Sequence, residues 1–240
     1  MDKKYLTPGS KTVAFVIEDT DWGRGNAGIT RGLFKADGWK TVTTETVSLG
    51  NTDFYPQLSK IKAMNPDILI ISLTNLSSGV ALVKQFHEIG LKCSLWAIYF
   101  PVRPEFIEQA GKSAEYLLFN PFTFDPEGVE KHKQFGEKVK KRWNKTVTID
   151  HAIAYDNINN LIDSIERAGS EEPKVLVEAI SNLDRRGIMG RWAFNKTNHA
   201  IIDGADYVPV ASAQIINGKR QIIWPPSLSK MEYQTPPWMK

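Results

Sequence analysis

The first 120 residues alternate short apolar runs with amphipathic stretches, and this rhythm limits the possible folds more than any other feature. The first run, TVAFVI at 12–17, is continuous and rich in β-branched residues, which is typical of a strand buried on both faces. Further strands are predicted at 40–47, 67–72, 94–98 and 115–120, with helices at 26–36, 53–64, 77–89 and 104–110 between them. Strands that alternate with helices predict an α/β fold with a parallel, doubly wound sheet.

After Pro121 the pattern becomes helical. Helices are predicted at 127–143, 149–168 and 173–183, followed by one strand-like segment at 190–194. The second of these helices carries a wide apolar stripe of Ala152, Ile153, Tyr155, Ile158, Leu161, Ile162 and Ile165. One short strand is too small to cover that stripe. We therefore expect this helical segment to lack a sheet of its own.

A hairpin is predicted near the C-terminus. Two β-rich runs, 207–216 and 220–224, flank Asn217-Gly218-Lys219, and Asn-Gly between such runs is a strong hairpin signal. Pro225 and Pro226 end the second strand. Pro236 and Pro237 stiffen the remaining tail, which we expect to lie extended over the surface.

Composition excludes several classes of protein. The chain has 240 residues, 42% of them hydrophobic and 24% charged, which excludes a disordered chain. The net charge is only +3 and the basic residues are dispersed, so no nucleic-acid partner is expected. No apolar run reaches the 18 or so residues of a membrane span, and the first ten residues lack the apolar core of a secretion signal. As written, the chain is expected to stay in the cytoplasm.

No constellation of residues calls for catalysis, a metal or a cofactor. The single Cys93 and four scattered histidines have no zinc spacing, and the GxSxG motif is absent. The segment GRGNAG at 23–28 fits GxGxxG, the pattern of a dinucleotide-binding turn. Five residues separate it from the preceding strand, and this spacing argues against a tight phosphate turn. An NAD-binding enzyme domain is therefore only a third-ranked possibility, and we predict a protein that is not an enzyme.

The loops at the carboxyl ends of the predicted strands are more informative, because open α/β sheets bind ligands there. These loops contain Asp19, Asp21 and Trp22, then Thr74, Asn75, Leu76 and Ser77, and finally Tyr99 and Phe100. Two large rings beside amide and hydroxyl groups suit a small polar solute. The alternative is that Trp22, Tyr99 and Phe100 only pack against neighbouring loops.

Several segments together resemble the second lobe of type I periplasmic solute-binding proteins. The nearest group is the branched-chain amino-acid (leucine/isoleucine/valine) binding proteins of ABC transporters. The segments are VAFVIEDTDWGRG at 13–25, TDF at 52–54, LSKIK at 58–62, NPD at 65–67, GLK at 90–92, AYD at 154–156, ERAGS at 166–170, GRWAF at 190–194, and NGK at 217–219 with IWPP at 223–226. The resemblance covers nearly the whole chain from Lys11.

The resemblance implies a two-lobed clamshell protein, of which this chain contains one complete lobe and part of the other. Residues 11–121 and 206–225 would form lobe two, 122–205 an incomplete piece of lobe one without its parallel sheet, and 226–240 a tail. The chain would thus be an N-terminally truncated form that binds solute weakly or not at all alone. Its parent would be periplasmic or extracellular and would deliver the solute to an ABC permease. A sensory ligand-binding domain of a receptor is the alternative, because receptor ectodomains share this fold.

By the same resemblance, the ligand contacts of lobe two would fall on Trp22, on Asn75 or Leu76, and on Tyr99. Some family members place an acid where Tyr99 stands, to pair with a ligand ammonium. Its absence here weakens the expectation of an α-amino acid and leaves amides and aromatic acids open. The uncovered stripe of the helical segment further predicts a homodimer, or else partial unfolding beyond residue 122.

Overall fold

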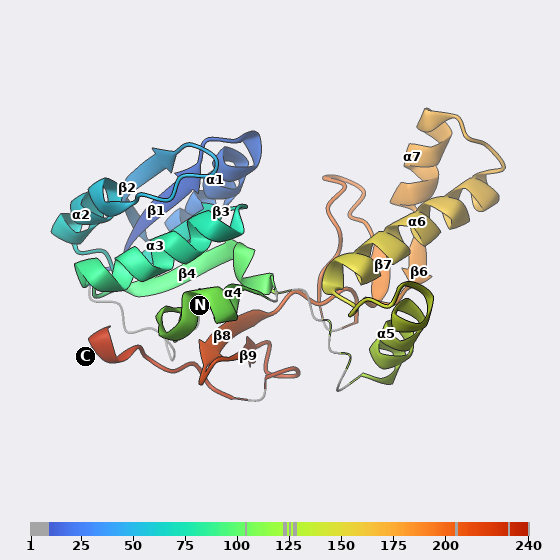
Figure 1. Cartoon of the computed structure of the whole chain (residues 1–240). Coiled ribbons are helices and arrows are strands. Elements are labelled where there is room, and N and C mark those ends of the chain that lie inside the picture. Colours follow the sequence, from blue (N-terminus) through green and yellow to red (C-terminus); the bar gives the residue numbers. More distant parts are fainter. Residues whose placement is uncertain are drawn as a thin grey trace. The chain divides into compact units, whose positions relative to one another are not determined.

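The computed structural model of the chain describes residues 10–103, 105–121, 124, 126, 129–204, 206–229 and 231–239 (Figure 1). It forms two compact units. The first comprises residues up to 121 together with those from 212 onward, and the second comprises 122–211. The first boundary, between residues 121 and 122, is the position at which the sequence pattern changes. The second boundary, between residues 211 and 212, lies six residues beyond the boundary predicted between 205 and 206.

The first unit is built on a seven-stranded sheet in the order β2-β1-β3-β4-β5-β8-β9. Strands β1 to β5 are parallel, and β8 and β9 join the β5 edge as an antiparallel pair. Their bounds are β1 Thr12–Glu18, β2 Lys40–Val47, β3 Ile68–Leu73, β4 Ser94–Tyr99, β5 Leu118–Phe119, β8 Ser212–Ile216 and β9 Lys219–Trp224. The parallel sheet and the C-terminal hairpin confirm the predicted fold class.

Two strands are shorter than predicted. β5 has only two residues, where the sequence predicts 115–120, and Tyr116 before it adopts a positive φ of 64°. The first strand of the hairpin begins at Ser212 rather than at Tyr207. The hairpin turn itself forms as predicted, with Asn217 and Gly218 both at positive φ, as a tight two-residue turn requires.

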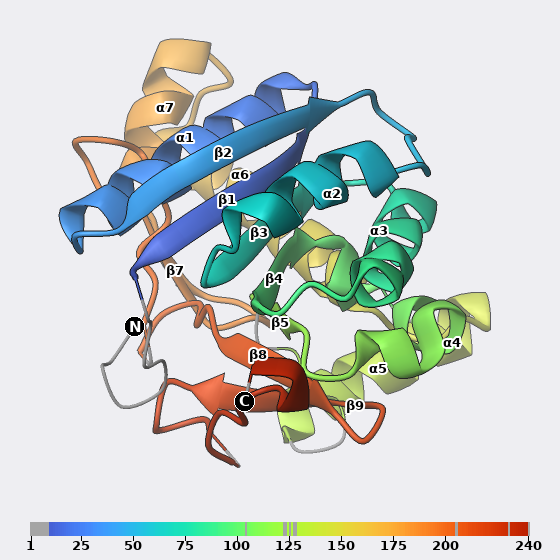
Figure 2. The same ribbon diagram turned by 90° about the vertical axis from the view of Figure 1, so that its left-hand side faces the viewer.

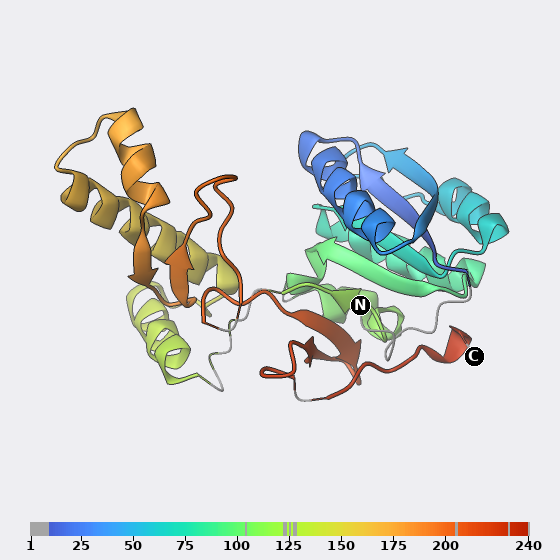
Figure 3. The same ribbon diagram turned by 180° about the vertical axis from the view of Figure 1, so that it is seen from behind.

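Helices cover both faces of this sheet. α1 (Asp21–Ala36) packs on one face, over a cluster that contains Val13, Phe15 and Ile70. α2 (Tyr55–Met64), α3 (Leu76–Ile89) and α4 (Glu105–Ala110) pack on the other, over a larger cluster. Figures 1 and 2 show α2 and α3 on one side of the strands, and Figure 3 shows α1 in front on the opposite side. Short 3-10 turns lie at η1 (Phe100–Val102), η2 (Gly111–Ala114) and η3 (Pro237–Met239).

The start of α1 differs from the prediction. Residues 18–25 were expected to form a loop, but the helix begins at Asp21 because the hydroxyl of Thr20 accepts a hydrogen bond from the backbone N–H of Gly23 at 3.0 Å. Gly23 is buried, and a β-carbon there would lie 2.3 Å from the carbonyl oxygen of Glu18. Gly23 thus permits the close approach of α1 to the end of β1, whereas a β-carbon at Gly25 or Gly28 would meet nothing within 4 Å.

The C-terminal tail is anchored rather than simply laid over the surface. Trp238 in η3 is partly buried against the core of the first unit, and its indole N–H donates to the carbonyl oxygen of Cys93 at 3.0 Å. The backbone N–H of Gln234 donates to the side chain of Gln214 at 2.9 Å. These bonds tie the tail to β4 and β8.

Where the structure describes it, the second unit contains three helices and a two-stranded sheet. The elements are α5 (Glu130–Trp143), α6 (Ile149–Ala168), α7 (Pro173–Ser181), β6 (Asp184–Arg186) and β7 (Arg191–Ala193). Residues 127 and 128 of the predicted first helix lie outside the described residues. β6, which the sequence analysis missed, pairs antiparallel with β7. No helix among the described residues is both long and apolar enough to cross a membrane.

α6 turns its polar face inward. Its buried residues are Ala152, Asp156, Asn160 and Ser164, which recur every four residues along one side. Most of the predicted apolar stripe faces outward, in agreement with the expectation that it lies uncovered, with Tyr155, Ile158, Leu161 and Ile162 between 40% and 59% exposed. The described residues of the second unit therefore leave much of the apolar face of α6 exposed.

Candidate functional site

The carboxyl ends of β1, β3 and β4 form one edge of the sheet of the first unit. β3 lies between β1 and β4 in the sheet order. The chain leaves β1 into α1, leaves β3 into α3, and leaves β4 into η1. The predicted site residues thus come from three adjacent strand ends, where ligands of open α/β sheets bind.

Trp22 and Tyr99 contact one another at this edge. Their ring centroids lie 6.0 Å apart with an angle of 65° between the planes, an edge-to-face arrangement. Each side chain remains 39% exposed. Trp22 stands in the first turn of α1, and Tyr99 ends β4 with φ at 80°, a backbone conformation that turns the chain sharply into η1. The fold therefore assembles an exposed aromatic pair from residues 77 positions apart.

Phe100, in contrast, belongs to the core. It is fully buried and packs edge-to-face on Phe106 at 5.2 Å between centroids. Its ring also lies so close to Gly79 that a β-carbon there would be 2.5 Å away. For Phe100 the interpretation as a packing residue is correct, whereas Trp22 and Tyr99 present their rings to solvent.

Asn75 and Leu76 occupy the strand end between the two rings. Asn75 is exposed and caps α3, because its side-chain oxygen accepts from the backbone N–H of Ser78 at 3.2 Å. Leu76 is half-buried and packs against the main core of the first unit. Both residues thus have structural roles at the start of α3, and Asn75 keeps an exposed amide at the edge.

Glu18 lies beneath this edge, and the sequence analysis overlooked it. Its carboxylate is buried and accepts hydrogen bonds from the backbone N–H and the hydroxyl of Thr74 and from the hydroxyl of Thr20. The three bonds satisfy the charge and fasten the end of β1 to the loop after β3. The sequence did contain a sign of this role, because Glu18 is an acidic residue at the end of an otherwise apolar strand.

Arg103 is a second residue that sequence reasoning missed. Its guanidinium carbon lies 5.7 Å from the centroid of the Tyr99 ring, and Nη2 lies 3.5 Å from the Tyr99 hydroxyl. Two side chains on the α1 side of the edge, Asp19 and Asp21, both pair with Arg24. Arg103 itself has no carboxylate partner among the residues that the structure describes.

Nothing in the described part of the chain resembles a metal centre, since no three His, Cys, Asp or Glu side chains gather there. Cys93 is buried at the start of the β4 region, and burial raises the pKa of its thiol to about 12. A thiol with such a pKa stays protonated at neutral pH and is a poor nucleophile.

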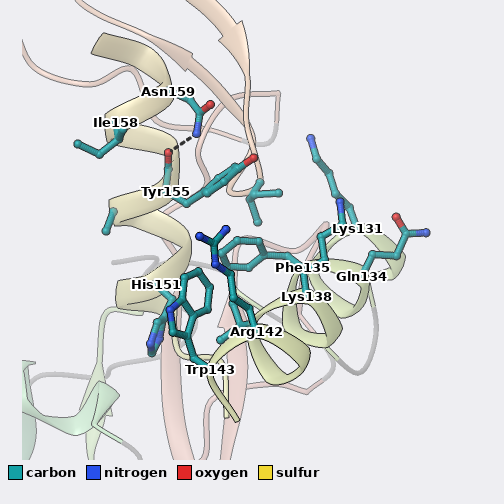
Figure 4. Close-up of a pocket in the computed structure, with 13 residues that line it drawn as sticks. Lys131, Gln134, Phe135, Lys138, Arg142, Trp143, His151, Tyr155, Ile158 and Asn159 are labelled. Carbon is teal, nitrogen blue, oxygen red and sulfur yellow. Dashed lines mark hydrogen bonds between the residues drawn. The ribbon is translucent and has the colours of Figure 1, made fainter. Parts of the chain in front are cut away.

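A groove of about 660 Å³ lies in the second unit between α5 and α6 (Figure 4). Tyr155 of α6 and Phe135 of α5 face one another across it, with centroids 5.2 Å apart. Its other lining residues include Lys131, Lys138 and Arg142 from α5, and no acidic side chain. The groove is thus apolar with a basic rim, a feature that was not predicted from the sequence.

Comparison with known proteins identifies the family. The model of the periplasmic binding protein family matches residues 4–215. Because this match spans most of the chain, the protein belongs to the periplasmic binding protein family. The resemblance described from the sequence motifs is therefore confirmed.

Individual relatives agree with this assignment. An amino acid binding protein of Pseudomonas aeruginosa is 25% identical over 201 residues, which are 83% of this chain and 52% of the relative. A Leu/Ile/Val-binding protein homolog of Brucella abortus is 24% identical over 179 residues, 74% of this chain and 47% of the relative. These relatives are named as binding proteins, which supports the prediction that this protein is not an enzyme.

Among solved structures, a Silicibacter pomeroyi protein provisionally described as a branched-chain amino acid ABC transporter superposes with a TM-score of 0.81 at 18% identity. The superposition covers 99% of this chain and 64% of that chain, and it establishes the fold. The chain spans about half the length of the curated relatives that it matches.

Proposed function

We propose that this chain supplies one wall of a binding site for a small organic solute, an amino acid or a related compound, in an ABC-type uptake system. The observation that carries the proposal is the exposed pair of Trp22 and Tyr99 at the carboxyl edge of a parallel sheet. A ring pair beside the exposed amide of Asn75 offers apolar contact area and hydrogen bonding together.

The names of the relatives support a solute-binding role, and one similar structure is provisionally described as an ABC transporter. One is named for amino-acid binding and another for binding leucine, isoleucine and valine. In this proposal residues 11–121 and 206–225 are lobe two of a clamshell, 122–205 belong to lobe one, and 226–240 form the tail. The complete protein would work in the periplasm, close on its solute by a hinge motion and deliver it to a permease.

Binding by this chain alone should be weak. Trp22, Asn75, Leu76 and Tyr99 provide a single wall, and a single wall buries only part of a small ligand, whereas tight small-molecule sites bury most of it. We therefore expect dissociation constants in the millimolar range for this chain.

Ligand-observed NMR with the 240-residue chain tests the proposal, using a panel of amino acids, their amides and aromatic acids at millimolar concentration. Replacing Trp22 or Tyr99 by Ala should weaken binding by about 1–3 kcal/mol through lost ring contacts. Tyr55→Ala is the matched control, because Tyr55 is 45% exposed but contacts Glu88 instead of Trp22. If all three variants bound the solute equally well, Trp22 and Tyr99 would be packing residues and not ligand contacts.

We also propose that the chain forms a homodimer through the apolar face of α6. Tyr155, Ile158, Leu161 and Ile162 present this face to solvent, and large exposed apolar patches favour association. A second copy is a suitable cover, because the segment carries complementary charges. The groove rim has Lys131, Lys138 and Arg142, and the region of α7 has Glu171, Glu172 and Glu178.

Light scattering tests the dimer. We expect twice the 27.0 kDa mass of the chain, and Ile158→Asp should restore the monomer mass. Ile29→Asp is the control, because Ile29 is also exposed but lies on α1 of the first unit. A monomer whose α6 amides resist hydrogen exchange would contradict the proposal, and a monomer with unprotected α6 would indicate that the second unit is partly unfolded alone.

A further inference from the structure

We infer that Arg103 anchors an anionic solute at this edge, and that the solute is an aromatic carboxylate rather than a zwitterionic aliphatic amino acid. This inference rests on the proposed function and names the class of ligand. Three acidic side chains at this edge already have a partner of opposite charge or a hydrogen-bond donor, whereas Arg103 has no carboxylate partner among the described residues.

Three acidic groups at the end of β1 and the start of α1 already have partners. Glu18 is buried and holds three hydrogen bonds from Thr20 and Thr74. Asp19 and Asp21 both bind the guanidinium of Arg24. A ligand ammonium would need a carboxylate acceptor, and here each of these three would have to give up an existing bond.

Arg103 is differently placed. The hydrogen bond and the cation–π contact of its guanidinium among the described residues both go to the Tyr99 side chain, with the cation 5.7 Å from the ring centroid and Nη2 3.5 Å from the hydroxyl. A guanidinium presents a planar fork of N–H donors that matches a carboxylate in two parallel hydrogen bonds. Arg103 thus offers a cation that no carboxylate of the described chain neutralises.

The backbone of Arg103 is fixed independently of its side chain. Arg220 of β9 donates from Nη2 to the carbonyl oxygen of Arg103 at 2.6 Å and from Nε to that of Pro101 at 3.0 Å. These two hydrogen bonds hold the turn after β4 in place. The guanidinium of Arg103 is therefore available to a ligand without loosening the turn that positions Tyr99.

The neighbouring rings select the rest of the ligand. Trp22 and Tyr99 lie edge-to-face and leave ring surface exposed, which suits a planar aromatic group beside them. The backbone amides at the start of α3, next to Asn75, add the positive end of a helix dipole to the same edge. A carboxylate on Arg103 and a ring against Trp22 and Tyr99 together describe an aromatic acid.

Benzoate, benzamide and leucine distinguish the possibilities, titrated into the 240-residue chain and followed by ligand-observed NMR. Benzamide keeps the ring and shape of benzoate but lacks its charge. We expect benzoate to bind at least about tenfold more tightly than benzamide or leucine, and Arg103→Gln to remove that preference. Arg31→Gln is the control, because Arg31 lies on α1 and donates to Thr44 instead.

The outcomes separate the inference from the proposed function. If benzamide or leucine binds as tightly as benzoate, or if Arg103→Gln leaves the preference unchanged, the role of Arg103 is refuted. The proposed function still stands in that case if Trp22→Ala weakens binding of whichever solute binds. Absence of binding by every solute in the panel would overturn both.

Discussion

The carboxylate of Glu18 accepts hydrogen bonds from both the backbone N–H and the hydroxyl of Thr74, at 2.8 Å and 2.9 Å. Glu18 ends β1, and Thr74 follows β3, the strand beside it in the sheet. A buried carboxylate is stable only when its oxygens are bonded, and here the bonds join the end of β1, just before the helix that carries Trp22, to the residue just before Asn75. Glu18 therefore acts as a structural tie beneath the candidate site.

Replacing this carboxylate tests the tie. Glu18→Ala should lower the free energy of unfolding by about 1–3 kcal/mol, because it leaves the half-buried N–H and hydroxyl of Thr74 without their acceptor. Glu18→Gln should cost less than about 1 kcal/mol, since the amide oxygen can still accept from Thr74. Urea unfolding measures both, and equal losses in the two variants would show that the bonds to Thr74 contribute little.

Asp156 has the corresponding role in the second unit. Its buried carboxylate accepts from the backbone N–H groups of Ile188 and Met189, both at 2.8 Å, and from the indole N–H of Trp192 at 3.0 Å. Asp156→Ala should destabilise this unit by about 3 kcal/mol or more, because three buried donors lose their acceptor. Hydrogen exchange of the α6 amides reports the loss.

The control for this variant lies on the same helix. Asp150→Ala removes an exposed carboxylate from the first turn of α6, where it interacts only with the helix dipole, and should cost at most about 1 kcal/mol. If Asp156→Ala proved no more damaging than Asp150→Ala, the buried bonds of Asp156 would not be what holds the hairpin of β6 and β7 to α6.

His87 should make stability depend on pH. Burial lowers its pKa below the ordinary value of 6.5, although its ring nitrogen Nε2 also bonds the carbonyl oxygen of Ser113 at 3.1 Å. The unfolded chain therefore binds a proton more readily, so the stability linked to this group is complete above pH 6.5 and is lost as the pH falls below it.

Comparison with His87→Gln isolates this effect. Between pH 7.5 and 5.5 the wild-type chain should lose up to about 1.4 kcal/mol more stability than the variant. This is the largest loss that protonation of one histidine in the unfolded chain alone can cause over that range. Parallel losses in the two proteins would mean that His87 titrates alike when folded and unfolded. Thermal or urea unfolding at several pH values provides the measurement.

Cys93 should be unreactive in the folded protein. Its side chain is 1% exposed, and burial raises its pKa to about 12, so thiolate is scarce at pH 8. We expect a thiol reagent to modify one thiol per chain in guanidinium chloride and almost none in native buffer over the same time. Rapid native modification would indicate that the region where Trp238 covers Cys93 opens readily.

Several features of the protein were predictable from the sequence because they depend on local pattern. The apolar run of β1 can be satisfied only with both faces buried, and Asn217-Gly218 can adopt the positive φ angles of a tight turn. Trp22 and Tyr99 were also predictable as site residues, because ligands of open α/β sheets bind at the carboxyl ends of the strands, and those ends follow from strand order and direction. Local pattern could not show that their rings touch.

Tertiary contacts decided the rest. The position of Arg103 beside Tyr99 depends on the turn held by Arg220, which is 117 residues away in the sequence. Periodicity identified the apolar stripe of α6, and the expectation that most of it lies uncovered agrees with the exposure of Tyr155, Ile158 and Leu161. The helix buries its opposite face because Asp156 on that face is the acceptor for three donors of the β6–β7 hairpin. Leaving these donors without an acceptor would be costly, and a sequence pattern records apolar spacing but not which distant donors need an acceptor.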